Sequence, residues 1–181
     1  MKVLRVLMIV TLGIAVLASA TWFFTHREEL PPLPVLGVDS VGTGVHSVQL
    51  FFAAPAGDSL VSEPRDVVEA GTLHERVAVL IAELERGPNR DGVKVLPRGT
   101  ALLHAYLDER GLLIVDLSRA FQQNFQGGTG AEQLAIGSLV GTLGANVPGV
   151  RQVRVVCGGA PLASLGGHLP FDRPFDVSDW R

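Results

Sequence analysis

Thr72-Leu73-His74-Glu75 opens a run that continues Arg-Val-Ala-Val-Leu-Ile-Ala-Glu-Leu-Glu-Arg and closes at Gly87-Pro88. The first four residues form a capping box, in which the Thr72 hydroxyl accepts from the Glu75 backbone N–H and the Glu75 side chain reaches back. Apolar residues then recur at helical spacing on one face, at Leu73, Val77, Leu80, Ile81 and Leu84. The stretch predicts one complete helix whose apolar face must pack against another layer of structure.

A second helix is predicted further along the chain, where Thr129-Gly130-Ala131-Glu132 repeats the capping-box pattern. Its apolar stripe consists of Ile136, Leu139, Val140, Leu143 and Val147. Pro148-Gly149 ends this helix, because proline cannot continue it. Both helices are therefore expected to be amphipathic.

Alternating and apolar runs predict strands around these helices. They comprise 48–52, a returning strand through 60–68, the pair 102–107 and 112–117 on either side of a turn at 108–111, and a last strand over 150–156. Pro64 restricts the second strand to a sheet edge, because proline has no N–H to donate. The order predicts an α+β fold, a two-layer sandwich of one small mixed sheet with both amphipathic helices on one face. The other face would be open to a partner.

The N-terminal run from Val3 to Phe24 is apolar apart from Arg5 near its start, and about 20 such residues suffice to cross a bilayer. Lys2 and Arg5 lie on its N-terminal side, so the positive-inside bias places the N-terminus in the cytoplasm. Ala18-Ser19-Ala20 has the pattern that a signal peptidase cleaves after Ala20. The run continues past it, which favours a retained transmembrane anchor over a cleaved signal peptide. The expected organisation is an anchor at 1–24, a Pro- and Gly-rich linker at 25–44 and one domain at 45–181.

The net charge limits the class of partner, and the cysteine content limits how the fold can be held together. Two of the 15 Lys and Arg residues lie in the first 24, so the rest of the chain carries 13 against 18 acidic residues, a formal net charge of −5. That balance argues against nucleic acid as a partner. A single cysteine, Cys157, excludes an internal disulfide framework.

The region from about Val48 to Arg173 resembles the GerMN domain, the module named after the spore germination protein GerM. The stretches that carry the resemblance are Val48–Phe52, Leu96–Thr100, Val115–Ser118 with Phe121, Gly141–Leu143, and Pro148–Val153 with Gly158. The resemblance implies a small α+β fold similar to the ring-building modules of secretion and sporulation complexes. It also implies a cell-envelope role without known catalysis. GerM has two such domains and this chain has one.

Two residue types with reactive side chains have simpler structural interpretations. A nucleophilic cysteine needs a nearby base, and alternation instead places Cys157 with Val153 and Val155 on one strand face, as a small buried hydrophobe. None of the five histidines forms a metal-binding pair at helical spacing: His26, His46, His74, His104 and His168. His74-Glu75 begins like a zinc-protease helix, but Ala78 stands where the second ligand would be.

Three further motifs also have structural interpretations. Asp116 with Ser118 could form a catalytic pair, but local hydrogen bonding to backbone at a strand end is the favoured interpretation. Gly127-Gly128-Thr129-Gly130 resembles a phosphate loop without its Lys, so it is interpreted as a flexible entry to the helix. Arg98-Gly99 is expected to be a structural turn, with contact between Arg98 and a partner carboxylate as the alternative. The sequence thus assigns no catalytic, cofactor-binding or metal-binding residue.

These observations favour a non-enzymatic, single-pass protein of the bacterial cytoplasmic membrane, with its domain outside, in the periplasm or wall zone. Residues 3–24 would hold it in the membrane. The domain would bind an envelope protein or peptidoglycan in sporulation, germination or envelope assembly, with self-association as a further option. The alternative is a peptidoglycan-directed enzyme or a small-ligand-binding envelope protein. Acidic residues such as Asp108 and Glu109 are available for that chemistry but have no diagnostic spacing.

Overall fold

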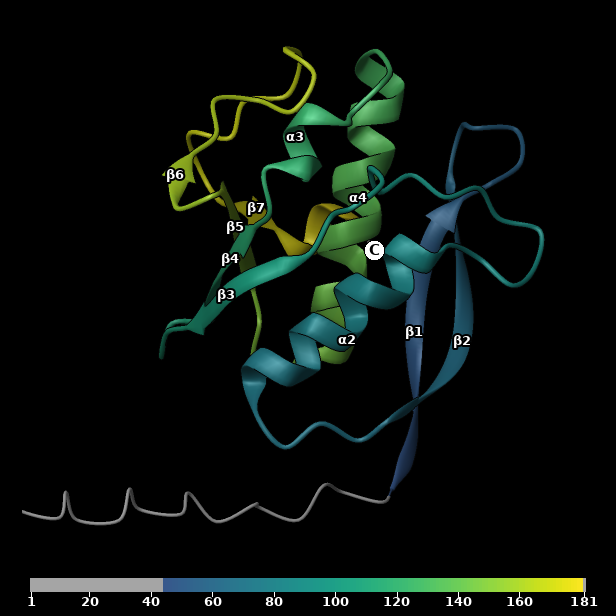
Figure 1. Ribbon diagram of the computed structural model, residues 1–181, viewed down its shortest axis with the longest axis vertical. Helices are drawn as coiled ribbons and strands as arrows, with labels where there is room; N and C mark the ends of the chain where they lie inside the picture. The colour runs from purple at the N-terminus through teal and green to yellow at the C-terminus, as the bar shows by residue number, and fades with distance from the viewer. Residues whose placement is uncertain (1–43, 181) are drawn as a thin grey trace, which may run out of the picture. The chain divides into compact units, whose positions relative to one another are not determined.

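The computed structural model describes residues 44–180, so the predicted anchor and nearly all of the linker lie outside the described residues. The elements are β1 (Val45–Ala53), β2 (Leu60–Val68), α2 (Leu73–Arg86), β3 (Leu102–Leu107), β4 (Leu112–Leu117), α3 (Ala120–Gln123), α4 (Thr129–Asn146), β5 (Gln152–Cys157), β6 (Ala160–Pro161), β7 (Phe175–Asp176) and the 3₁₀ helix η1 (Val177–Trp180) (Figure 1). This order confirms the predicted succession of five longer strands and two longer helices. The sequence prediction did not include α3, β6, β7 and η1. Within residues 44–180, no helix is both long enough and apolar enough to cross a membrane.

The main sheet contains β3, β4 and β5, and the predicted mixed character is confirmed. β3 and β4 pair antiparallel, whereas β4 and β5 pair parallel. The short strands β6 and β7 both pair with β5. Inward residues of this sheet, such as Leu113, Val115 and Val153, have no more than 2% of their surface exposed. The sheet therefore buries one face against the two longer helices, as predicted.

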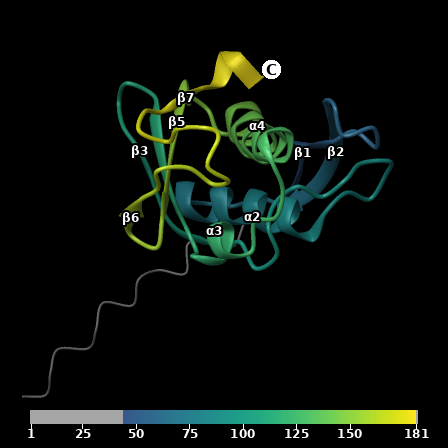
Figure 2. The same ribbon diagram turned by 90° about the horizontal axis from the view of Figure 1, so that it is seen from above.

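The first two strands do not join that sheet, and the prediction of a single sheet in two layers is wrong. β1 and β2 form a separate antiparallel hairpin, paired from Val45↔Val68 to Ala53↔Leu60. The hairpin packs on the side of α4 away from the main sheet (Figure 2). Pro64 does lie in a strand that pairs on one side only, as expected. Alternation predicts a buried face but not which element covers it, so sequence alone did not separate the two sheets.

Helix α2 forms as predicted. Glu75 N donates to Thr72 Oγ1 at 3.2 Å, and Thr72 N donates to Glu75 Oε2 at 3.0 Å, which completes the capping box. The side chains of Val77, Leu80 and Leu84 are buried on its inner face. Gly87 follows the last helical residue with φ of 98°, a backbone conformation that favours glycine.

The capping box predicted at the start of α4 is wrong. The N-cap is Gly128, not Thr129, and no side chain caps the helix. Glu132 N donates to Gly128 O at 3.0 Å, so Glu132 lies four residues after the N-cap, one too many for a capping box. Its side chain is fully buried and points into the protein. The same four residues are compatible with two start positions of the helix. Contacts with a loop distant in sequence favour the start position that is observed.

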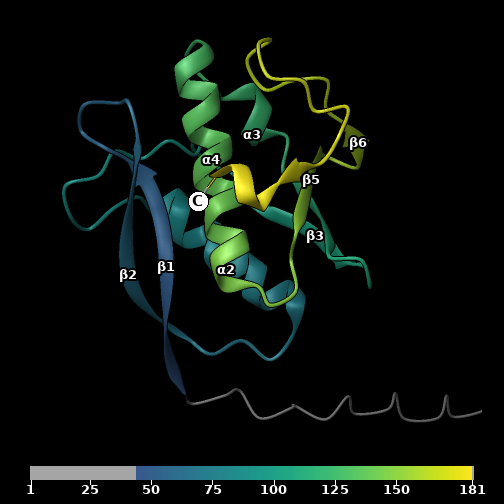
Figure 3. The same ribbon diagram turned by 180° about the vertical axis from the view of Figure 1, so that it is seen from behind.

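Helix α4 is not amphipathic, contrary to expectation, because it is buried on all sides from Ala135 to Leu143. The predicted stripe does form the core side. The small and polar residues between those positions contact β1 and η1 instead. Figure 3 shows η1 crossing α4 beside β1. A helix surrounded in this way places the hairpin and the C-terminal segment next to each other.

Three polar side chains of α4 bind the backbone of β1. Ser138 Oγ donates to Phe51 O at 2.5 Å, and Phe51 N donates to Thr142 Oγ1 at 3.1 Å. One turn further, Gln49 N donates to Asn146 Oδ1 at 2.9 Å, and Asn146 Nδ2 donates to Gln49 O at 2.7 Å. The three side chains recur every four residues, so they lie on one face of the helix. They fix the hairpin along α4.

Candidate functional site

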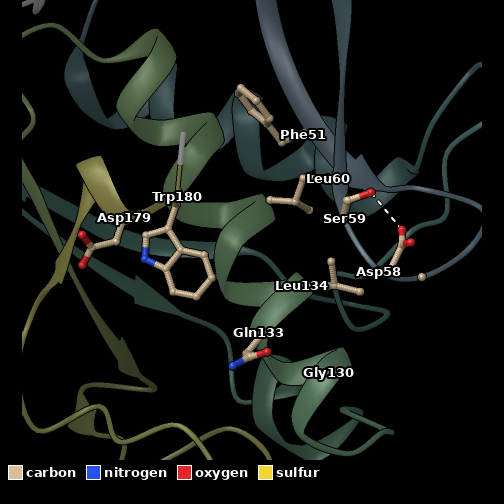
Figure 4. Close-up of a pocket in the computed structure, with 10 residues that line it drawn as sticks. Phe51, Asp58, Ser59, Leu60, Gly130, Gln133, Leu134, Asp179 and Trp180 are labelled. Atoms are coloured by element: carbon tan, nitrogen blue, oxygen red, sulfur yellow. Dashed lines mark hydrogen bonds between the residues drawn. The ribbon is translucent and has the colours of Figure 1, made fainter.

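An open groove of about 540 Å³ lies between the hairpin, α4 and η1 (Figure 4). Apolar side chains in its lining are Phe51, Leu60, Leu134 and Trp180, and polar ones are Asp58, Ser59, Gln133 and Asp179, together with Gly57 and Gly130. We call it the hairpin groove. Its residues come from four separate segments of the chain, so only the folded domain assembles it.

Two glycines of α4 shape this groove. A Cβ on Gly137 would lie 2.7 Å from Trp180 Cε3 and 2.9 Å from Leu60 Cδ1. A Cβ on Gly141 would lie 3.3 Å from the Trp180 carbonyl oxygen. Glycine inside a helix costs about 1 kcal/mol relative to alanine, and here it lets the indole rest on the helix backbone. Phe175 supports the other side of the indole in an edge-to-face contact, with ring centroids 6.3 Å apart.

The charge of the hairpin groove is acidic. Its described lining holds the carboxylates of Asp58 and Asp179 and no basic side chain. Asp58 accepts a hydrogen bond from its neighbour Ser59, with 2.9 Å between Oγ and Oδ1. A second hollow of about 400 Å³ lies across Trp180 and Asp179 and includes Arg173. The acidic character is thus strongest on the side of the hairpin.

The main sheet has a second candidate surface, the face turned away from the helices. Tyr106, Ile114 and Arg154 occupy paired positions across β3, β4 and β5 and form one row on this open sheet face. Tyr106 has 63% of its surface exposed, and Ile114 and Arg154 are half-buried. An exposed aromatic ring beside an aliphatic side chain and a guanidinium is typical of protein-binding surfaces.

Glu132 is a fully buried carboxylate that organises the segment between β6 and β7. Its Oε1 accepts from Leu165 N and Gly166 N, each at 2.9 Å, and its Oε2 accepts from His168 N at 3.0 Å. Burial alone would raise the pKa of Glu132, but these backbone hydrogen bonds outweigh it, so the pKa lies below its usual value. His168 Nδ1 lies 3.4 Å from Oε2 and is half open to solvent. The carboxylate is occupied by three backbone N–H groups and fixes this loop, so its role is structural.

A second buried cluster joins the hairpin to the end of α2. The Arg65 guanidinium pairs with Glu63 and with Glu83, whose Oε2 lies 2.8 Å from Nη1, and Arg65 Nη2 also donates to Gly87 O at 3.0 Å. Burial would raise the pKa of Glu63, but Arg65 and the backbone N–H groups of Asn89 and Arg90 lower it. Every carboxylate in the cluster is held by a partner, as a buried charge requires. The cluster therefore stabilises the fold by joining the hairpin to α2.

The reactive residues identified in the sequence, Cys157, Asp116 and Ser118, have structural roles. Cys157 is buried with Val153 and Val155 on the helix-facing side of β5, as predicted, and burial raises the pKa of its thiol. Asp116 Oδ1 accepts from Gly159 N at 3.0 Å, and Ser118 Oγ donates to Gly99 O at 3.0 Å. Both side chains therefore bind backbone groups, but these partners are distant in sequence and not local as the sequence predicted.

The histidines and the turn residues singled out from the sequence lie in different parts of the fold. His46, His74, His104 and His168 come from different elements, and His26 lies outside the described residues. No group of three metal-ligating side chains occurs within residues 44–180. Gly99 adopts the expected positive φ, 80°, and Asn124 Nδ2 donates to Arg98 O at 2.8 Å, so the turn is structural as predicted. Gly128 serves as the N-cap of α4, a helix entry as predicted.

Sequence reasoning missed the residues that build the hairpin groove, Trp180 above all. The signal that could have found them is the spacing of Gly137, Gly141 and Gly144 within a predicted helix. Glycine at helix-interior positions usually marks a close contact. Its partner segment, however, lies more than 30 residues further along the chain, and only the folded structure identifies it.

The fold places the domain in the class of GerMN folds. It is similar to the tandem GerMN domains of the sporulation protein GerM from Bacillus subtilis, with a TM-score of 0.61 and 19% identity over 75% of this chain and 48% of that one. It is also similar to the first GerMN domain of the same protein, with a TM-score of 0.60 and 20% identity over 74% of this chain and 99% of that one. A protein from Clostridium perfringens named as a lipoprotein matches with a TM-score of 0.50 and 20% identity, over 78% and 92% of the two chains.

The chain belongs to the Germane family, described as sporulation and spore germination, whose family model matches residues 49–163. This confirms the resemblance drawn from the sequence. The chain spans about half the length of the tandem GerM structure. No curated protein matched the chain.

Proposed function

We propose that this chain is a non-enzymatic cell-envelope protein whose GerMN-type domain binds a partner outside the cytoplasmic membrane. The observation that carries the proposal is the open sheet face, with Tyr106 63% exposed beside Ile114 and Arg154. An envelope protein is the first choice of partner, peptidoglycan the second, and a second copy of this chain the third. Membership of a sporulation and germination family supports a role in those processes.

In this proposal residues 3–24 anchor the protein in the membrane with the N-terminus in the cytoplasm. The apolar length of that run and the basic residues before and within it support the orientation. The similarity to a protein named as a lipoprotein supports an envelope location. N-terminal sequencing of the mature protein tests the anchor: retention of the first 20 residues is expected, and a start at Thr21 would show that the anchor is removed.

Mild crosslinking in intact cells, followed by purification from membranes, tests the binding role. We expect a crosslinked partner whose yield falls when Tyr106 is replaced by alanine. Glu109→Gln, in the exposed turn between β3 and β4, provides a control that leaves the open sheet face unchanged. Recovery of monomer alone, without partner or wall association, would contradict the proposal.

The enzymatic alternative has a direct test. Asp116 and Ser118 are engaged with backbone groups, which leaves neither poised as a base or nucleophile. Incubation with purified wall polymer should therefore release no fragments. Fragment release that disappears in Asp116→Asn would establish the enzyme and end the binding proposal.

A further inference from the structure

We infer that the hairpin groove binds a short segment of a partner protein in which an apolar side chain is flanked by lysine or arginine. This inference rests on the proposed binding function and specifies the chemistry of the partner. It concerns a surface on the side of α4 away from the open sheet face. The two surfaces can therefore be tested separately.

The centre of the groove suits an apolar anchor. Leu60, Leu134 and Trp180 surround its floor in Figure 4, and each is only partly covered by the protein itself. Burying a leucine-sized side chain in such a site is the main source of affinity in peptide recognition. The indole is held between the α4 backbone and Phe175, so little rotational freedom is lost when a ligand binds.

The rim of the groove suits basic flanking residues. Asp58 and Asp179 lie on opposite sides of the apolar centre in Figure 4, and both carboxylates are exposed. The described lining offers no basic side chain to neutralise them. A lysine or arginine on each side of the anchor would meet one carboxylate, and the rings of Phe51 and Trp180 would add cation–π attraction. An anionic polymer or an acidic segment would be repelled.

Polar groups inside the groove remain available to a peptide backbone. Among the described residues, neither the Gln133 amide nor the Trp180 indole N–H takes part in an intramolecular hydrogen bond. Both line the groove. An amide and an indole N–H can pair with main-chain groups of any sequence. The side-chain preference would then come from the apolar centre and the acidic rim.

Trp180 makes binding directly measurable. The chain has two tryptophans, so the full chain with Trp22→Phe, placed in phosphatidylcholine nanodiscs, carries Trp180 as its single fluorophore. Neutral lipid avoids attraction of basic peptides to the membrane. The probes are acetyl-Lys-Val-Leu-Lys-amide, the same peptide with both lysines replaced by glutamate, and a tetramer of N-acetylglucosamine. We expect a saturable change in emission with the lysine peptide alone, weakened by added salt.

Charge reversal tests the role of the rim. Asp58→Lys should weaken binding of the lysine peptide by more than the two- to five-fold loss expected from removing one exposed carboxylate. The double variant Asp58→Lys with Asp179→Lys should prefer the glutamate peptide. Glu109→Lys changes the net charge by the same amount as Asp58→Lys but lies in the turn between β3 and β4, so it should leave binding unchanged.

Several results would overturn the inference. No saturable response to the lysine peptide, or equal binding in Asp58→Lys, would exclude the groove as a basic-segment site. A response to the sugar tetramer alone would assign the groove to a glycan. A crosslinked partner retained in full by the double lysine variant would also exclude the groove, while the proposed binding function would stand.

Discussion

Replacement of Glu132 by glutamine should destabilise the domain by about 2.5–6 kcal/mol at pH 7. The carboxylate accepts three backbone N–H groups, from Leu165, Gly166 and His168. Glutamine keeps one acceptor oxygen for two of them and turns an NH₂ donor towards the third. A hydrogen bond to a charged group contributes about 1.5–3 kcal/mol, and an unsatisfied buried donor costs about 1–3 kcal/mol. The sum is a large fraction of the roughly 5–15 kcal/mol that stabilises a typical domain.

The effect of Glu132→Gln should depend on pH with a defined sign. The folded-state pKa of Glu132 lies below the ordinary carboxyl value of 4.5. The stabilisation that the ionised Glu132 carboxylate provides is therefore fully present above pH 4.5. It is lost as the pH falls through the folded-state pKa. Urea unfolding of the detergent-solubilised chain, followed by circular dichroism, should show a difference between wild type and variant that shrinks below about pH 4.5. Glu109→Gln, an exposed change, should stay within about 0.5 kcal/mol of wild type. A loss at pH 7 below that value, or one independent of pH, would refute the reasoning.

Three other substitutions test the packing around α2 and α4. Arg65→Ala leaves the buried Glu63 carboxylate without its cation and leaves Glu83 with only the exposed Arg86, so it should cost about 3–5 kcal/mol in urea unfolding at pH 7; a loss below 1 kcal/mol would show that the cluster is solvated. Gly144→Ala places a methyl group on Val177, so η1 should detach and the emission of Trp180 should shift to longer wavelength in the Trp22→Phe background; unchanged emission would contradict the close contact. Thr142→Val removes the acceptor of an edge-strand N–H and should cost about 1–3 kcal/mol by the same unfolding assay; a neutral result would mean that water replaces the hydroxyl.

The elements that sequence predicted correctly depend on neighbours along the chain. The capping box of α2 links Thr72 to Glu75, three residues apart, and both partners lie in one helical turn. The turn at 108–111 is similar, because Asp108 Oδ1 accepts from Arg110 N and Leu112 N. Such contacts need only residues that are close along the chain, so the pattern alone identifies them.

The features that sequence missed depend on distant contacts. The start of α4 is set by Glu132, which the backbone at 165–168 draws inward. The separate hairpin follows from the binding of β1 to α4, whose partners are 87 to 97 residues apart. The hairpin groove combines four segments and therefore has no continuous motif. Its acidic and aromatic residues appeared in the sequence as unrelated positions.

The polar contacts along α4 also bear on how this domain avoids aggregation. An unpaired strand edge is a template for pairing with other chains. Ser138, Thr142 and Asn146 occupy the free edge of β1 with side-chain hydrogen bonds, so no foreign strand can add there without displacing the helix. On the opposite edge of the hairpin, Pro64 interrupts the row of N–H donors. The domain can thus expose a long hairpin and still resist assembly into fibrils.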